Sequence, residues 1–408
     1  MPISKRRFLK ATTLAFPALS LTTKSLPAED AIDIAADRAV VDLTDLKEPL
    51  IIQSVDLLKK ANEYFVRVRT KDGAEGVSVT NSRAALFHPV FNQRIAPYFV
   101  NQDARDIEHH LFEVFRFRSN YKLQGIALWC PVAWIEFAIL DLLGRAANKP
   151  IWQLLGKQQR ARVPFYVASG NRNNPPEAEV EYLQQLLAET NGRSVKYRIG
   201  GRMSRNADSI PGRTEKLIPL SRKFLGDKVA IHADSNSSYD ARNGIRVGRL
   251  LEEIDAVYLE EPCPFDQLGE TRKVTQSLDI PVAGGEQEFS EWRFKYAIRN
   301  RVVDIVQPDL QYYGGLIRSK RVAHMAETAG MPTTCHISGG FGFIYSLHFA
   351  ACTKNIGPWQ EYKRGIEKYA DWFASPLTIA DGAISIPTSP GVGIANPDEM
   401  LKGSTKVG

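Results

Sequence analysis

The spacing of hydrophobic residues changes near residue 160. Before that point, residues 64–70 alternate between apolar and polar, whereas residues 132–144 are apolar on most faces and end at a glycine. Alternation is typical of a half-buried strand, and a helix that is apolar all round is typical of a buried one. The pattern therefore predicts an α+β domain over residues 31–155, with a first strand at residues 31–34.

After residue 160, short apolar runs alternate with amphipathic segments, as parallel strands covered by helices require. The expected strands are 163–168, 194–199, 229–233, 256–259, 281–284, 302–307, 332–336 and 359–362, and the expected helices are 178–189, 214–225, 244–254, 270–278, 291–300, 317–329 and 345–352. Eight strands fit a (β/α)8 barrel over residues 160–370. Residues 371–408 are expected to form loops and short strands that return to the first domain.

The N-terminal segment carries much of the net charge. The chain has 408 residues and a formal net charge of +6, and residues 1–28 contain five Lys or Arg and no acidic residue. The run from Ser4 to Lys10 resembles a twin-arginine export signal, and the apolar stretch 11–21 is too short to span a membrane. We therefore expect residues 1–28 to direct export to the periplasm without a stable membrane anchor. The alternatives are a non-functional signal, which leaves the protein cytoplasmic, and a disordered basic arm.

Composition excludes several classes of protein. With 44% hydrophobic and 24% charged residues, the chain is neither disordered nor fibrous. Nucleic acid is not an expected partner, because no basic helix or aromatic-interleaved basic strand is present. The four cysteines, at positions 130, 263, 335 and 352, form no CxxC pair. We expect buried free thiols, with a 335–352 disulfide as the alternative in an oxidising compartment.

Three acidic residues follow consecutive expected strands. Asp234, Glu260 and Glu286 are each 26 residues apart, which is one strand-helix unit. Because active sites of such barrels lie at the C-terminal ends of the strands, the three carboxylates should meet at one mouth, where they would repel one another without a cation. Oxygen-only ligands favour Mg²⁺ over zinc. For any one of these acids alone, a helix N-cap or a surface charge is the alternative.

The remaining strand ends supply a candidate base and two cations. Asp309 and His336 end the next two expected strands, and a carboxylate that binds one imidazole nitrogen makes the other nitrogen more basic. His336 is therefore the expected general base. Lys196 and Arg198 alternate on one strand, so both should point into the barrel.

These motifs resemble the enolase superfamily, and within it the mandelate racemase subgroup, from about residue 31 to 395. The matching segments are Lys196-Tyr197-Arg198, Asp234-Ser235-Asn236, Glu260-Glu261-Pro262, Gly285-Glu286-Gln287, Gln307-Pro308-Asp309, Cys335-His336, Gln360-Glu361, the helix 138–144 and the tail 390–393. The resemblance implies a barrel with an N-terminal α+β capping domain that the C-terminal tail completes. Such barrels commonly form symmetric homo-oligomers.

The resemblance also implies a reaction, the abstraction of a proton α to a carboxylate with Mg²⁺ stabilising the resulting enediolate. It implies that Asp234, Glu260 and Glu286 bind the metal, and that His336 is the base with Asp309 as its hydrogen-bond partner. Lys196 would neutralise the substrate carboxylate, and Asn236 would contact the α-hydroxyl or the metal. Glu361, in its protonated form, would donate a hydrogen bond to the substrate.

One residue departs from the family pattern. Arg198 stands where the racemases of the family have a second lysine, and an arginine does not deprotonate under ordinary conditions. We therefore expect dehydration of a small carboxylate, a sugar acid (aldonate or aldarate), to a 2-keto-3-deoxy acid. The alternatives are a racemase or epimerase of a 2-hydroxy or amino acid, and a non-catalytic exported binding or sensor protein. The long connection between Arg198 and Asp234 contains arginines that either bind the distal end of an acidic substrate or are simply solvated.

Overall fold

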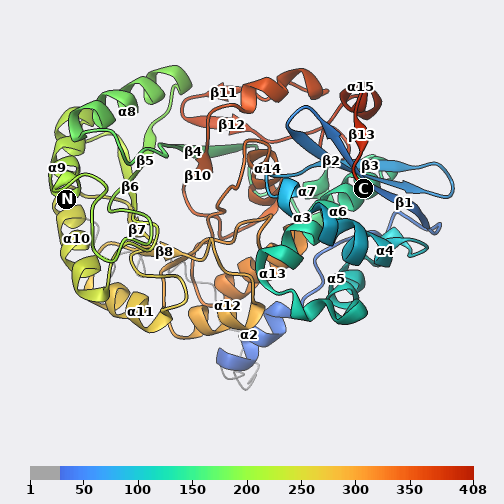
Figure 1. The fold of residues 1–408 in the computed structure, drawn as a ribbon, viewed down its shortest axis with the longest axis horizontal. Helices are drawn as coiled ribbons and strands as arrows, with labels where there is room; N and C mark the ends of the chain where they lie inside the picture. Colours follow the sequence, from blue (N-terminus) through green and yellow to red (C-terminus); the bar gives the residue numbers. More distant parts are fainter. Residues whose placement is uncertain (1–27) are drawn as a thin grey trace, which may run out of the picture.

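The computed structural model describes residues 28–408, so all but the last residue of the expected signal 1–28 lies outside the described part of the chain. Figure 1 shows two bodies side by side, a blue-to-teal layer of sheet and helices and a green-to-orange ring of strands surrounded by helices. The red C-terminal segment lies beside the blue strands. This arrangement confirms the predicted barrel with a capping domain.

The capping domain is an antiparallel sheet covered by helices. The sheet has the strand order β13-β1-β2-β3. Its first strands are β1 (Ile52–Lys60), β2 (Glu63–Thr70) and β3 (Glu75–Val79), and its helices are α3 (Ala84–Val90), α4 (Ala96–Phe99), α5 (Ile107–Arg116), α6 (Gly125–Ala146) and α7 (Ile151–Leu155). Helix α6 packs against β2 and β3. It is apolar and long enough to cross a membrane, but 89% of its most apolar window is buried inside the protein, as expected for a core helix.

The expected strand at residues 31–34 is wrong, because these residues belong to helix α2 (Ala28–Ala36). Its buried residues Ile32, Ala35 and Ala36 have the i, i+3, i+4 spacing of one helix face, whereas Ile34 is exposed. Helix α2 packs with this face against α13 (Leu316–Thr328) of the barrel. A window of four residues is too short to distinguish the two periods.

The barrel strands are parallel and follow the chain order. They are β4 (Arg162–Ala168), β5 (Ser194–Arg198), β6 (Ala230–Asp234), β7 (Tyr258–Glu260), β8 (Val282–Gly284), β9 (Ile305–Val306) and β10 (Gln360–Tyr362), which pairs with β4. The helices around them are α8 (Pro176–Thr190), α9 (Arg213–Leu225), α10 (Ala241–Glu253), α11 (Leu268–Ser277), α12 (Glu291–Arg299), α13 and α14 (Gly342–Cys352). The helix positions agree with those expected from the sequence to within a few residues.

The expected strand at 332–336 is not a regular strand. Only isolated bridges join Thr333 to Val306 and Ile356, and His336 to Asp309. Pro332 has no N–H to donate, and Pro308 interrupts the neighbouring strand in the same way, so the ladder stays too sparse for regular pairing. This segment nevertheless occupies the seventh position of the barrel, between β9 and β10.

The C-terminal segment contacts both domains. Its hairpin β11 (Ile379–Ala380) and β12 (Ala383–Ser385) adds to β4, and after α15 (Pro397–Leu401) the strand β13 (Thr405–Lys406) pairs with β1. The predicted return of the tail to the cap is therefore present. The boundaries between the domains stay a prediction.

Two buried carboxylates of α6 join the cap to the rest of the molecule. Asp141 accepts hydrogen bonds from the backbone N–H of Val77 at 2.8 Å and of Val392 at 2.7 Å. Glu136 accepts from the N–H of Leu316 at 3.1 Å and of Ile317 at 2.7 Å, at the start of α13. Burial raises the pKa of Glu136 to about 8, although the two N–H groups act in the opposite direction. The two acids therefore fix the tail and a barrel helix to one cap helix.

A substitution at Gly391 tests the importance of the contact between the C-terminal tail and Asp141. Gly391 has a φ of +65°, and an added Cβ would overlap Asp141 Oδ1 and lie 2.9 Å from the Asp141 carbonyl oxygen. We expect Gly391→Ala to lower the free energy of unfolding by about 1–3 kcal/mol more than Gly403→Ala does. Gly403 has a φ of +79° with no atom within 4 Å of an added Cβ, so it is a matched control for backbone strain alone. Equal losses in equilibrium urea unfolding would show that the close approach to Asp141 is unimportant.

Candidate active site

The C-terminal ends of the strands bring the sequence-predicted residues together. Lys196 and Arg198 end β5, Asp234 ends β6, Glu260 ends β7 and Glu286 follows β8 by two residues. All are buried, and one oxygen from each of the three acids lies within 4.8 Å of the others. The three carboxylates thus form the cluster that their spacing predicts.

The local backbone explains how two of these acids point into the mouth. The hydroxyl of Ser235 donates to the carbonyl oxygens of Glu260 at 3.1 Å and Glu261 at 2.7 Å, which ties the ends of β6 and β7 together. Gly285 has a φ of +119°, and the Phe294 ring packs where its side chain would be. Glycine therefore allows the chain to turn sharply and present Glu286 to the mouth.

The donor set fits a hard divalent cation. The acids Asp234, Glu260 and Glu286 offer carboxylate oxygens only, and Glu286 Oε2 is buried with no hydrogen bond among residues 28–408. In this structure the nearby cations are Lys196, 2.8 Å from Glu260, and Arg198, which is paired with Asp234. Mg²⁺ prefers oxygen ligands of this kind, so these three residues are the ones that would hold it.

His336 and Asp309 form the expected pair. His336 Nδ1 lies 2.6 Å from Asp309 Oδ2, while Nε2 lies 3.3 Å from Glu286 and 3.8 Å from Glu361. Asp309 Oδ1 accepts from the N–H of Gln311 at 2.7 Å. Burial lowers the pKa of His336, but the charges of Glu286 and Glu361 and the hydrogen bond that His336 donates to Asp309 outweigh it and raise the pKa above its ordinary value. Asp309 therefore occupies Nδ1, and Nε2 is the nitrogen that faces Glu286 and Glu361 at the mouth.

The structure disagrees with the expectation that Glu361 is protonated. Its carboxylate lies 3.3 Å from Lys196 and 3.7 Å from Lys363, and His336 is also near. Burial alone would raise its pKa, but these cations and Arg198 hold the pKa well below its usual range. Glu361 is therefore held as a carboxylate in this arrangement.

Several residues of the mouth were missed by the sequence reasoning. Glu261 is buried beside the three acids, and burial together with the charges of Glu286 and Glu260 raises its pKa. The predicted Asn236 donates from Nδ2 to Asp234 at 3.2 Å and to Glu261 at 3.4 Å, and its Oδ1 accepts from Arg172. Glu261 could have been found as the second acid of its motif. Arg172 has no such signal, because it lies in a loop without a repeating pattern.

The cap also reaches the site. Asn81, just after β3, donates from Nδ2 to Ser338 Oγ at 3.0 Å, and Ser338 Oγ lies 3.4 Å from Asp309 Oδ1. Capping-domain residues therefore contact the segment that carries the histidine.

Both domains of the chain match known protein families. Residues 24–156 match the N-terminal domain of the mandelate racemase / muconate lactonizing enzyme family, and residues 178–400 match the enolase C-terminal domain-like family. The chain belongs to the mandelate racemase / muconate lactonizing enzyme family of the enolase superfamily.

Individual members of this family are similar over most of their length. The arabinonate dehydratase of Saccharolobus solfataricus is 28% identical over 82% of this chain and 88% of its own. A crystal structure of a proposed racemase from Roseobacter denitrificans has a TM-score of 0.81 at 33% identity and covers 88% of this chain and 99% of its own. A family protein from Paracoccus denitrificans complexed with magnesium has a TM-score of 0.79 at 27% identity, with 88% and 99% coverage.

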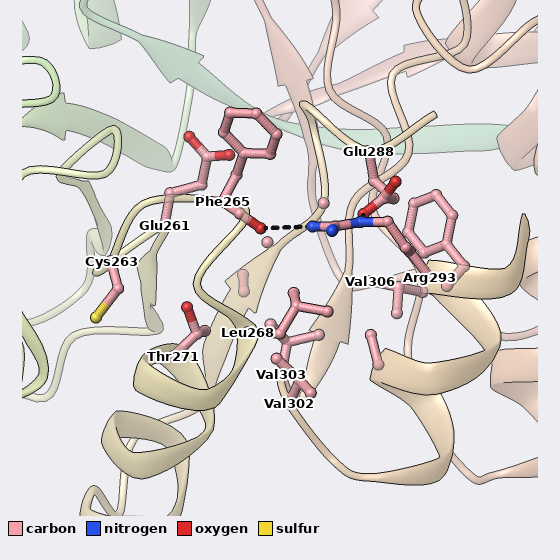
Figure 2. Close-up of a pocket in the computed structure, with 15 residues that line it drawn as sticks. Glu261, Cys263, Phe265, Leu268, Thr271, Glu288, Arg293, Val302, Val303 and Val306 are labelled. Carbon is pink, nitrogen blue, oxygen red and sulfur yellow. Dashed lines mark hydrogen bonds and ion pairs between the residues drawn. The ribbon is translucent and has the colours of Figure 1, made fainter. Parts of the chain in front are cut away.

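This family member has a cavity between its strand ring and the surrounding helices. Figure 2 shows it between β8, β9 and the helices α11 and α12, where Arg293 pairs with Glu288 and donates to the Phe265 carbonyl oxygen. The cavity is about 40 Å³, and its lining is largely apolar. It shares Glu261 with the mouth but includes none of the three candidate metal ligands. The candidate metal ligands and the His336–Asp309 pair therefore lie outside this cavity.

Lys196 is the main counter-charge of the mouth, and its removal tests this role. Lys196→Met leaves Glu260 and Glu361 buried without this partner, so we expect the free energy of unfolding to fall by about 3–5 kcal/mol. The double variant Lys196→Met/Glu260→Gln removes both charges and should lose clearly less. Urea unfolding in EDTA measures the two values without a competing divalent ion. A double variant at least as unstable as the single one would contradict charge compensation as the cause.

Proposed function

We propose that the protein abstracts the proton α to the carboxylate of a sugar acid and eliminates water from the β-carbon to give a 2-keto-3-deoxy acid, in a Mg²⁺-dependent reaction. The observation that carries this proposal is the His336–Asp309 pair, whose Nε2 lies 3.3 Å from Glu286 at the mouth that Lys196 and Arg198 also line. Localisation outside the cytoplasm and a homo-oligomeric state remain predictions from the sequence.

The first step needs a base and a way to offset negative charge. Nε2 of His336 takes the α-proton, while Asp309 holds Nδ1–H and so fixes the tautomer. Lys196 and Arg198 supply positive charge for the substrate carboxylate. Magnesium bound by Asp234, Glu260 and Glu286 would supply further Lewis-acid stabilisation of the charge that develops on the carboxylate oxygens.

The second step returns the proton. Protonated His336 donates to the β-hydroxyl, the C–O bond breaks, water leaves, and the resulting enol tautomerises to the 2-keto acid. Inversion at the α-carbon requires a base on each face, and Arg198 cannot serve as the second one. The similarity to a dehydratase of arabinonate supports elimination from a sugar acid.

A screen of aldonates and aldarates with Mg²⁺ tests the function. We expect one or more acids to yield a keto acid, detected as its semicarbazone, and His336→Asn to lower the rate by about 100-fold or more, because the base is removed. The variant should unfold at a similar temperature as the wild type, since Asn keeps a polar group at the mouth.

Two outcomes would contradict this function in different ways. Solvent deuterium entering the α-position of unreacted substrate, with inversion and no loss of water, would indicate a racemase or epimerase. Ligand binding that is unchanged after replacing Asp234, Glu260 and Glu286 by their amides, with no turnover by the wild type, would indicate a binding or sensor protein.

The pH dependence tests the raised pKa of His336. The base must be neutral, so kcat/KM should decrease as the pH falls through the raised pKa of the imidazole. Asp309→Asn removes a group that raises this pKa, so the acidic limb should move to lower pH while kcat falls by about 10²–10⁴-fold. Asp279→Asn, at an exposed surface position, is the control. An acidic limb that does not move in Asp309→Asn would rule out His336 as the group that titrates.

A further inference from the structure

Arg172 is an arginine of the mouth with no role in the steps above. It lies in the loop after β4, and its Nη2 donates to Asn236 Oδ1, next to the acid cluster. Its Nε is buried and has no hydrogen-bond partner in the described part of the chain. A buried donor without a partner costs free energy, so this guanidinium can donate a hydrogen bond to an acceptor on a ligand.

The charges around Arg172 favour an anionic acceptor. Burial, and after it the charges of Arg198, Arg202 and Arg213, together lower the pKa of Arg172 to about 9 against the opposing charge of Glu286. Burial and these like charges therefore both disfavour the charge of the guanidinium. A ligand with a negative group at this point would relieve the repulsion and satisfy the free donor.

The connection between β5 and α9 holds Arg172 in place. Ser209 Oγ donates to the carbonyl oxygen of Arg172 at 2.5 Å, and Arg213 Nε donates to that of Asn174 at 2.7 Å. The same connection is tied to the loop after β6, since the N–H of Met203 donates to the Asn236 carbonyl oxygen at 3.1 Å. The long segment between Arg198 and Asp234 thus supports an arginine of the neighbouring loop.

The position of Arg172 in the barrel places it away from the base. Its guanidinium contacts Asn236, two residues beyond the end of β6, which is the third strand of the ring, whereas His336 lies in the seventh position, on the opposite side of the ring. A substrate whose α-proton faces His336 therefore lies between the two groups. Its carboxylate at C1 is accounted for by Lys196 and Arg198, so Arg172 is available to the other end of the chain.

We propose that Arg172 binds the distal carboxylate of a dicarboxylic sugar acid, so that the protein selects aldarates over the corresponding aldonates. This inference rests on the proposed function and adds to it the class of sugar acid. An aldarate and its aldonate differ only at the last carbon, which is a carboxylate in one and a hydroxymethyl group in the other. Arg172 is thus a specificity residue, and the proton transfers remain with His336.

Binding to an inactive protein tests the selection directly. Titration calorimetry with Mg²⁺ on the full-length His336→Asn variant compares four aldarate/aldonate pairs of matched configuration, which separates binding from turnover. We expect the aldarate of the pair that binds best to bind about tenfold more tightly or better, as one charge-assisted interaction provides. Adding Arg172→Gln should bring this ratio close to one and leave the affinity for the aldonate within about threefold, whereas Arg172→Lys should keep part of the ratio.

A matched variant controls for the general effect of charge. Arg242 is an exposed arginine at the start of α10, so Arg242→Gln removes the same charge on the same side of the barrel and should leave the ratio unchanged. Thermal unfolding checks that Arg172→Gln is folded.

The outcomes separate the two proposals. Binding of acid sugars with no preference for aldarates, or an equal loss of affinity for both acids in Arg172→Gln, would overturn the role of Arg172 and leave the proposed function standing. No binding of any acid sugar in the presence of Mg²⁺ would overturn the proposed function together with this inference.

Discussion

The structure depends on cations that offset the negative charge buried at the C-terminal end of the strand ring. Asp234, Glu260, Glu286, Glu261 and Glu361 all have almost no exposed surface. One unpaired buried charge costs several kcal/mol, which is comparable to the whole stability of a typical domain. Lys196 is placed to offset this cost, because its ammonium group reaches three of these acids at once. The same surplus of carboxylate oxygens makes the mouth suitable for a divalent cation, so stability and metal affinity have one physical origin.

Buried acids elsewhere in the molecule behave differently because of their partners. Asp141 and Glu136 of α6 are surrounded by backbone N–H groups, which fix them to the tail and to the start of α13. The connection between β9 and α13 contains Asp309, the partner of the histidine. Through these contacts the capping domain is bonded to the start of a barrel helix, a few residues beyond Asp309. The cap is therefore part of the catalytic geometry as well as a cover for it.

The sequence was sufficient to predict the barrel and its acid cluster, since acids at one strand-helix period can only converge at one mouth. His336 could be identified by position alone. Other features depend on contacts that no local pattern reveals. The hydrophobic pattern of helix α2 is too short to distinguish a helix from a strand. At the seventh barrel position, prolines interrupt the hydrogen bonds between the strands. The charge of Glu361 is set by Lys196 and Lys363, which come from separate strand ends, and Arg172 acquires its surroundings from a loop that carries no motif.

Residues at the ends of strands and residues in loops differ in how freely they can be substituted. Lys196, Asp234 and Glu260 are the last or near-last residues of hydrogen-bonded strands, so moving any of them disturbs its neighbours in the ladder. Arg172 is held instead by side chain to backbone bonds between two loops, and these can change without altering strand register. The proposed recognition of a distal carboxylate by Arg172 can therefore change independently of the candidate proton-transfer residues. This separation explains how a barrel can retain the residues for one first chemical step while loop residues select the substrate.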